Sequence, residues 1–279
     1  MGQPSNFFLM KGNWWRLVGF LFLTFGMIVI WTIPLFLIYA GKIYDRHFID
    51  TDFTYQFLSQ MAMSGGAVSA AYIMVVKIES RLLSDYFLTV RIKPLLKGFL
   101  IGLLMIMIFA ALASFFRVLD FQYQKITVSA AVSFAFYLFV AVGEEIIFRG
   151  YILNNLREKM SDLRALIISS ILFGLVHYFN DYFTWIGFAS ISISGFLMGW
   201  VMLKYNSISS AIGMHWSWNF IQGPVLGFAV SGHEEFGVFT PMRLSSDVFT
   251  GGKFGAEGSL ILAMMSCLSL FLFISRQKN

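Results

Sequence analysis

Long apolar runs alternate with short polar stretches along the chain. A helix needs about 17–25 mostly apolar residues to cross a hydrocarbon core about 30 Å thick. Eight runs approach this length, although the fifth is short and charged residues interrupt the fourth. They lie at roughly 17–40, 57–76, 98–116, 128–153, 163–178, 185–203, 207–229 and 259–275. The pattern predicts an all-α fold, a polytopic transmembrane helical bundle with about eight spans.

The composition excludes most classes of soluble protein. Hydrophobic residues make up 58% of the chain and charged residues 13%, against about 45–50% and 25% in soluble globular domains. The first run is longer than the apolar part of a signal peptide, which has about 7–15 residues, so we expect it to be retained as a helix. Cys267 is the single cysteine, so no disulfide forms within the chain.

The basic residues indicate topology. The formal net charge is +5, but Lys and Arg flank the apolar runs instead of forming a basic tract, so no nucleic-acid partner is expected. The N-terminus, the even-numbered loops and the C-terminus carry most of them. By the positive-inside rule, both termini are predicted to be cytoplasmic. The seventh loop, roughly 230–258, would then be the longest outer segment.

Small residues predict close helix packing. Gly195 and Gly199 form a GxxxG face, and Ser64, Gly65 and Gly66 allow another backbone to approach the second run. We interpret both as structural. His233 and Glu234 resemble the start of a zinc-binding helix motif, but no second His follows three residues later, which argues against a metal site there.

Two acids lie inside an apolar run. The aspartates all fall in or near loops, whereas Glu144 and Glu145 lie within the fourth run, where an ionised residue costs about 2.5 to 3.5 kcal/mol. Residues four apart share a helix face, so Glu145 can reach Arg149, while Glu144 points about 100° away without a local partner. Glu144 therefore suits a proton acceptor. In the alternative interpretation, both acids only hold helices together.

Two further polar pairs favour a catalytic site. Phe173 and His177 are four apart in the fifth run, and His215 and Asn219 are four apart in the seventh. Glu144 and His177 lie equally far from the turn between the fourth and fifth runs. In an antiparallel hairpin they should therefore lie at one height and face each other.

Together these side chains contain the parts for hydrolysis by an activated water. Glu144 and His177 could hold and deprotonate the water, and His215 and Asn219 could donate hydrogen bonds to the oxyanion. A zinc site built from Glu144, His177 and His215 remains open. The spans contain no aspartate pair, and the chain has no H-E-x-x-H or G-x-S-x-G motif.

The three motifs, in this order, resemble those of the type II CAAX prenyl proteases and their bacterial relatives, the CPBP intramembrane proteases, also called the Abi family. They are Glu144-Glu145-x-x-x-Arg149, Phe173-x-x-x-His177 and His215-x-x-x-Asn219. The resemblance covers roughly 128–225, between an N-terminal part, 1–127, and a C-terminal part, 226–279. It implies that Glu144, His177, His215 and Asn219 are catalytic, and that Glu145 and Arg149 support them together with Phe173.

The resemblance also implies a substrate class and a location. Relatives were described first as metalloproteases and later as glutamate proteases, so we expect no cofactor, with zinc as the alternative. The substrate would be a membrane-associated peptide or protein, either lipidated and CAAX-like or of the bacteriocin or pheromone type. The enzyme would lie in a prokaryotic cell membrane, surrounded by lipid. A non-catalytic immunity or scaffold protein is a second hypothesis, and a proton-coupled transporter, which would need inverted repeats, is a third.

Overall fold

The computed structural model describes residues 13–125 and 128–275, and most of these residues are helical. The α-helices are α1 Asn13–Tyr39, α2 Arg46–Thr51, α3 Phe53–Tyr72, α4 Ile92–Phe115, α5 Val128–Glu145, α6 Asn154–Arg157, α7 Asp162–Val176, α8 Trp185–Tyr205, α9 Ile208–Phe220, α10 Asp247–Thr250 and α11 Leu260–Ser275. Three π-helical segments continue α3, α5 and α9, namely η2 Ile73–Ile78, η4 Ile146–Leu153 and η6 Ile221–Val225. Single 3-10 turns are η3 Leu83–Tyr86, η5 His177–Phe179, η7 Gly252–Phe254 and η8 Ala256–Gly258.

Each of the eight predicted runs falls on a helix. Within the described residues, six helices are long and apolar enough to cross a membrane: Trp14–Tyr39, Phe53–Ile78, Ile92–Phe115, Ala131–Arg157, Asp162–Phe179 and Trp185–Tyr205. The seventh and eighth runs form α9, with 13 residues, and α11, with 16, which are shorter. The structure is therefore that of a multi-pass membrane protein with six candidate spans, and the count of eight stays a prediction.

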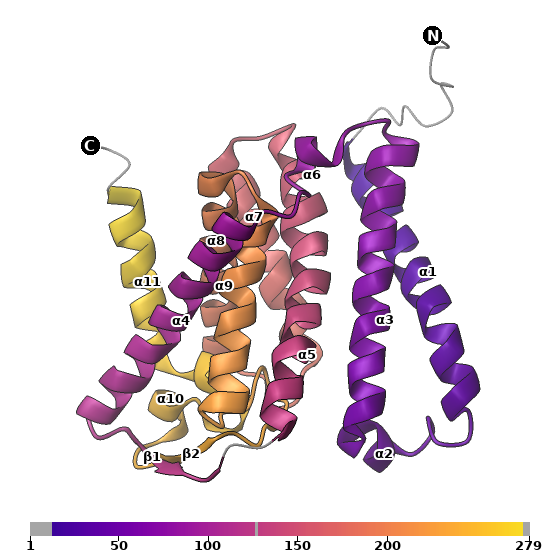
Figure 1. Cartoon of the computed structure of the whole chain (residues 1–279). Coiled ribbons are helices and arrows are strands. Elements are labelled where there is room, and N and C mark those ends of the chain that lie inside the picture. The colour runs from indigo at the N-terminus through magenta and orange to yellow at the C-terminus, as the bar shows by residue number, and fades with distance from the viewer. Residues whose placement is uncertain (1–12, 126–127, 276–279) are drawn as a thin grey trace, which may run out of the picture.

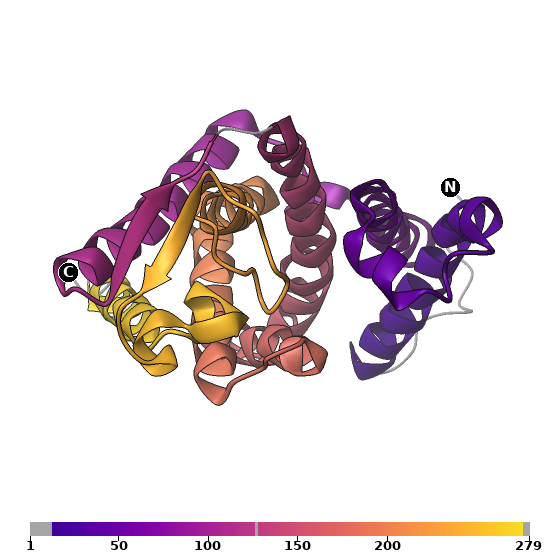
Figure 2. The same ribbon diagram turned by 90° about the horizontal axis from the view of Figure 1, so that it is seen from below.

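The long helices run up and down in alternation, so that α1 begins and α11 ends at the same end of the bundle (Figure 1). Helices α5, α7, α8 and α9 form the centre, where α7 packs on α8 and α5 on α9. The α1–α3 pair lies to one side against α5, and α4 and α11 lie on the other side (Figure 2). The predicted site residues all belong to the central helices or to segments that continue them.

The structure is mostly helical, as predicted, and also contains one two-stranded sheet. Strands β1 (Leu119–Tyr123) and β2 (Phe239–Arg243) pair antiparallel, with Leu119 opposite Arg243, and cross the lower end of the bundle (Figure 2). The predicted seventh loop also contains α10, η7 and η8, so much of it is ordered structure. Pairing between the two strands satisfies backbone groups that lie beyond the helix ends. Strands of five residues carry too little periodicity to stand out in sequence.

A correction concerns the fourth run, which we expected to be a regular α-helix. It changes to the π-helical η4 directly after Glu145. The Asn154 Nδ2 atom donates hydrogen bonds to the carbonyl oxygens of Arg149 (3.1 Å), Gly150 (3.0 Å) and Tyr86 (2.9 Å). These bonds support the end of the wider turn. Single π turns inside helices are frequent at functional sites.

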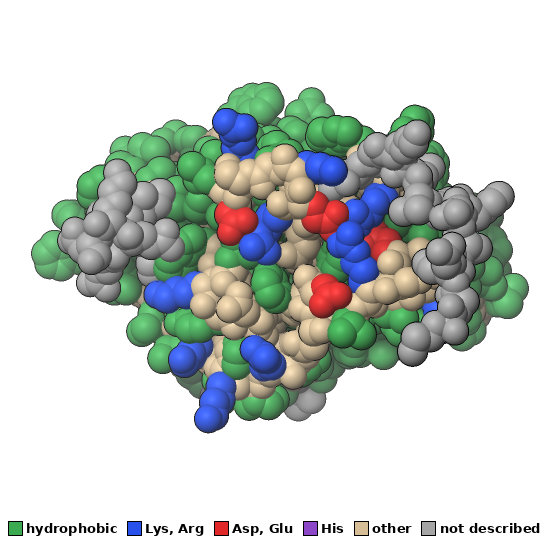
Figure 3. All heavy atoms as spheres, turned by 90° about the horizontal axis from the view of Figure 1, so that it is seen from above, with side chains coloured by type: hydrophobic (Ala, Val, Ile, Leu, Met, Phe, Trp, Pro, Cys, Tyr) green, Lys and Arg blue, Asp and Glu red, His purple; other side chains and the backbone are tan. Residues whose placement is uncertain are grey.

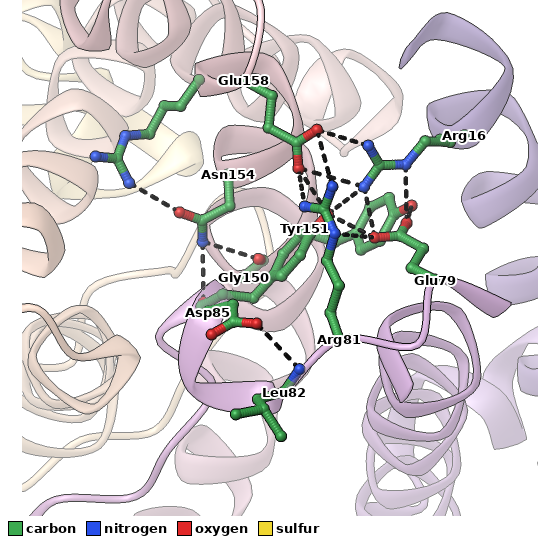
Figure 4. Close-up of polar contacts among 11 residues, drawn as sticks. Arg16, Glu79, Arg81, Leu82, Asp85, Gly150, Tyr151, Asn154 and Glu158 are labelled. Carbon is green, nitrogen blue, oxygen red and sulfur yellow. Dashed lines mark hydrogen bonds and ion pairs between the residues drawn. The ribbon is translucent and has the colours of Figure 1, made fainter. Parts of the chain in front are cut away.

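Charged side chains gather at the upper end of the bundle (Figure 3). Arg16 of α1 binds Glu79 (Nε to Oε1, 3.0 Å) and Glu158 (Nη1 to Oε2, 2.7 Å), and Glu79 accepts a 2.5 Å hydrogen bond from Tyr151 of η4 (Figure 4). Arg81 also pairs with Glu158. Although burial acts in the opposite direction, hydrogen bonds from Arg16 and Arg81 hold the pKa of Glu158 below its usual value. This cluster ties α1 and the end of α3 to the helix that carries Glu144.

Glycines let the backbones of neighbouring helices meet. A Cβ on Gly66 would lie 2.7 Å from the Ile28 backbone, and one on Gly65 would lie 2.9 Å from the Trp31 ring. The second predicted run thus packs against α1 through the predicted small residues. The α4–α9 contact is closer still, because a Cβ on Gly98 would lie 1.9 Å from the Ser210 carbonyl oxygen.

Gly98→Ala should therefore destabilise the protein by about 1–3 kcal/mol, since α4 would have to move away from α9. The measurement is the free energy of unfolding in detergent. Gly26→Ala in α1 is the matched control, because nothing lies within 4 Å of the added methyl group. It should be neutral or stabilising by up to about 1 kcal/mol. Equal effects of the two changes would contradict this packing.

Candidate active site

Glu145 and Arg149 form the ion pair that their spacing predicts. The Glu145 Oε1 and Arg149 Nη1 atoms are 2.9 Å apart, and the two side chains are 0% and 1% exposed. Two charges can persist at this depth only if they are paired, because removing one partner leaves an uncompensated buried charge. The pair is therefore a fixed feature of the helix that carries Glu144.

The same oxygen of Glu145 also binds His215 of α9, which lies 70 residues further along the chain. The His215 Nδ1 atom is 2.9 Å from Glu145 Oε1. Since Arg149 already donates to this oxygen, His215 donates to it as well and carries a proton on Nδ1. The His215 Nε2 atom then lies 3.8 Å from Glu144 Oε2. Glu145 thus orients the imidazole toward Glu144.

The Phe173 ring packs beside the Arg149 guanidinium and both histidine rings. The Arg149 guanidinium is 4.0 Å from the centre of this ring, and the His177 and His215 rings are 5.0 and 6.0 Å away. A cation over an aromatic face is attracted by the quadrupole of the ring. Phe173 therefore packs the three motifs into one cluster, a role that its spacing from His177 did not reveal.

The predicted GxxxG face on α8 makes room for this cluster. A Cβ on Gly195 would lie 2.7 Å from Arg149 Nη2 and 3.0 Å from Phe173 Cδ1. One on Gly199 would lie 2.7 Å from Leu166. The small residues hence allow α8 to cover the buried arginine.

His177 begins η5, at the point where α7 ends. Its Nδ1 atom donates a 2.8 Å hydrogen bond to the Phe173 carbonyl oxygen, so Nε2 of the neutral ring is left as an acceptor. In the described part of the chain, no hydrogen bond or ion pair joins His177 to Glu144. That these two residues face each other across a water stays a prediction.

Asn219 lies one turn beyond His215 on α9 and is 5% exposed. Its amide forms no hydrogen bond with the residues that the structure describes. Two carboxylate oxygens, Glu144 Oε2 and Glu145 Oε2, are likewise buried and accept no hydrogen bond from them. Most buried polar atoms in proteins have a partner. The site therefore has the capacity to bind a water or a polar group of a substrate.

The residues do not gather as a zinc site. Across the described ranges, no three His, Cys, Asp or Glu side chains lie at a spacing that could hold a metal ion. Glu144, His177 and His215, the set that the sequence left open as a zinc site, are thus not grouped as metal ligands here. The zinc alternative stays a prediction, and we derive no step through a metal.

Comparison with known proteins shows a similarity to one family over about a third of the chain. Residues 126–221 match the family model described as Type II CAAX prenyl endopeptidase Rce1-like. This range contains α5, η4, α7, α8 and α9, and with them all three motifs. Among curated proteins, none matches the chain.

Arg149→Met should destabilise the protein by about 3–5 kcal/mol, because Glu145 would remain buried with one partner fewer. Chemical unfolding in detergent measures the change. Arg157→Met is the control, since Arg157 pairs with Asp162 near the surface, where the Asp162 side chain is 58% exposed. Breaking this pair should cost at most about 1 kcal/mol. A small effect at Arg149 would show that the buried pair does not organise the site.

Proposed function

We propose that this relative of the type II CAAX prenyl endopeptidases is an intramembrane endopeptidase in which Glu144 and His177 activate a water molecule. The observation that carries the proposal is the position of Glu144 Oε2, buried without a donor and 3.8 Å from an imidazole that Glu145 orients. A general base needs such an unpartnered oxygen, because the water that it deprotonates must donate a hydrogen bond to it.

In the first step, the water gives its proton to Glu144 while its oxygen attacks the carbonyl carbon of the peptide bond. The Nε2 atom of His177, free to accept because Nδ1 binds the Phe173 carbonyl, takes the second hydrogen bond of the water. The C–N bond then breaks, and Glu144 returns the proton to the leaving amine. No covalent bond between enzyme and substrate forms in this sequence.

His215 and Asn219 stabilise the oxyanion in this proposal. Because His215 donates from Nδ1 to Glu145, it can donate from Nε2 as well only as an imidazolium. Two carboxylates, one guanidinium and one imidazolium then leave the cluster without net charge. Each donor aimed at an oxyanion contributes about 3–4 kcal/mol to catalysis.

The substrate that we propose is a membrane-associated peptide or protein, lipidated and CAAX-like or of the bacteriocin or pheromone type. The matched family supports the CAAX-like class. Hydrolysis without a cofactor is part of the proposal, and a zinc-dependent form of the same protease is the alternative that experiment has to decide.

We further propose eight crossings, with both termini on the cytoplasmic side of a prokaryotic cell membrane. In support, α1 begins and α11 ends at one end of the bundle (Figure 1), and Lys and Arg gather at that end (Figure 3). Basic residues near the ends of spans are enriched on the cytoplasmic side.

Glu144→Gln should lower kcat at least about 100-fold, since the amide cannot accept the proton of the water. Cleavage of a prenylated CAAX peptide and of its unprenylated form, measured in proteoliposomes, tests this. The melting temperature should stay unchanged, because Glu144 is not part of the buried ion pair. Glu234→Gln, an exposed acid between α9 and α11, is the control and should keep full activity.

Full activity in the Glu144→Gln variant would refute the role of Glu144 as the general base, whereas the absence of cleavage by the wild-type protein would favour the immunity or scaffold hypothesis. Cleavage in the presence of a strong zinc chelator tests whether the enzyme depends on zinc. The proposal predicts that cleavage is unchanged. Loss of cleavage that added zinc restores would establish the zinc-dependent alternative.

Topology can be tested with single cysteines in a Cys267→Ser background. Tyr44 and Val90 are both 84% exposed and lie in successive loops, between α1 and α2 and before α4. On intact cells, a membrane-impermeant maleimide should label Tyr44→Cys but reach Val90→Cys only after permeabilisation. The reverse pattern would invert the proposed orientation.

A further inference from the structure

One buried acid lies outside the three motifs and outside the matched range. Glu257 belongs to η8, in the α9–α11 connection (residues 226–259), and is 6% exposed. Its Oε2 atom accepts a 2.9 Å hydrogen bond from the Ser231 backbone N–H, and its Oε1 atom accepts one from Ser231 Oγ at 3.3 Å. The Gln222 side chain, whose Nε2 atom donates to the Ala229 carbonyl oxygen at 2.9 Å, also lies near this carboxyl group. A carboxylate with two such donors is suited to be ionised.

Ser231 and Gln222 connect Glu257 to the turn that carries His177 and to the end of α9. Asn180, three residues after His177, donates from Nδ2 to the Ser231 carbonyl oxygen at 2.9 Å. Gln222, three residues after Asn219, accepts a 2.9 Å hydrogen bond from Trp218 Nε1. Glu257 is therefore linked through Ser231 to the turn that carries His177, and through Gln222 to the end of α9.

Close backbone contacts hold the α9–α11 connection in this place. Gly232 has a φ of +92°, and a Cβ there would lie 2.1 Å from the Asp181 carbonyl oxygen. Gly255 has a φ of +105°, and a Cβ there would lie 2.0 Å from the Ala229 carbonyl oxygen. Tyr137 of α5 donates a further hydrogen bond to Glu235. The connection is thus anchored to α5, to the turn after α7 and to the end of α9.

Glu257 also interacts electrostatically with the site. Burial raises the pKa of its carboxyl group, and the neighbouring Gln222, the hydrogen bonds from Ser231 and the nearby His177 act in the opposite direction without cancelling the rise. The titratable groups that face it are His177 at the end of α7 and Tyr137 of α5. Since the pKa is raised, Glu257 takes up its proton at a higher pH than an exposed glutamate does.

We propose that Glu257 is a positioning residue for the hydrolysis described above, on which this inference rests. In its ionised form it binds Ser231 beside Gln222, and so sets the distance between His177, which holds the water, and Asn219, which faces the oxyanion. Displacing a catalytic group by about 1 Å can reduce a rate about 100-fold. Protonation of Glu257 removes one hydrogen-bond acceptor, so the α9–α11 connection holds His177 and Asn219 less firmly.

The test compares Glu257→Gln with Glu234→Gln, an exposed acid of the same connection, in the full-length protein in proteoliposomes with the prenylated CAAX peptide. Glu257→Gln should lower kcat about 10- to 100-fold with KM within about twofold of the wild type, because geometry and not substrate binding is changed. Glu234→Gln should resemble the wild type.

The pH dependence of kcat provides a readout that a merely structural role would not change. Wild-type kcat should fall as the pH is lowered through the raised pKa of Glu257, because protonation of Glu257 disturbs the positioning. In Glu257→Gln this part of the pH dependence should be missing. A kcat loss that disappears at lower assay temperature, with an unaltered pH profile, would overturn the proposal in favour of a purely structural role.

Asn180→Ala keeps the inference testable if Glu257→Gln fails to fold. It breaks the link between Ser231 and the His177 turn, so it should lower kcat about tenfold at an unchanged melting temperature. Wild-type kcat in this variant would overturn the positioning role. Full activity in Glu144→Gln would instead refute the proposed hydrolysis through Glu144, whereas an inactive Glu144→Gln beside a fully active Glu257→Gln would refute the positioning role alone.

Discussion

The structure depends on one carboxylate oxygen inside an apolar bundle, Glu145 Oε1, to which two side chains donate hydrogen bonds. Arg149 and His215 each lie 2.9 Å from it. An unpaired charge at this depth is strongly destabilising, so Glu145, Arg149 and His215 have to stay together. The Phe173 ring covers the guanidinium, and Gly195 lets α8 approach it. Helices α5, α7, α8 and α9 are thereby held in a single arrangement around Glu144.

Two networks join this centre to segments outside the matched range, one at each end of the bundle. At the upper end, Tyr151, two residues after Arg149, binds Glu79, which in turn pairs with Arg16 of α1 (Figure 4). On the other side, the α9–α11 connection reaches the turn after His177 through Ser231 and Asn180. The central helices supply the chemical groups, and the flanking segments restrict how far these groups can move. This division is consistent with a family match that covers residues 126–221.

Local spacing explains which features of the site could be predicted. Glu145 and Arg149 are four apart on one helix, and helix geometry alone brings them together. The glycines of α3 and α8 were also recognisable, because small residues let helices approach closely in a membrane. The change to a π-helix after Glu145 was not, since it depends on Asn154 and on the Tyr86 carbonyl that lies 68 residues away.

The sequence by itself determined that the chain is a helical membrane protein and that Glu144, Glu145, His177, His215 and Asn219 are out of place in apolar runs. Hydropathy and the cost of buried charge are properties of short stretches, so they can be read without coordinates. The tertiary structure alone decided that Glu145 orients His215, that Phe173 packs beside residues of all three motifs, that β1 pairs with β2, and that Glu257 lies buried beside the site. Each of these contacts joins residues far apart in the chain, and the packing of whole helices and connections, which no local pattern encodes, brings them together.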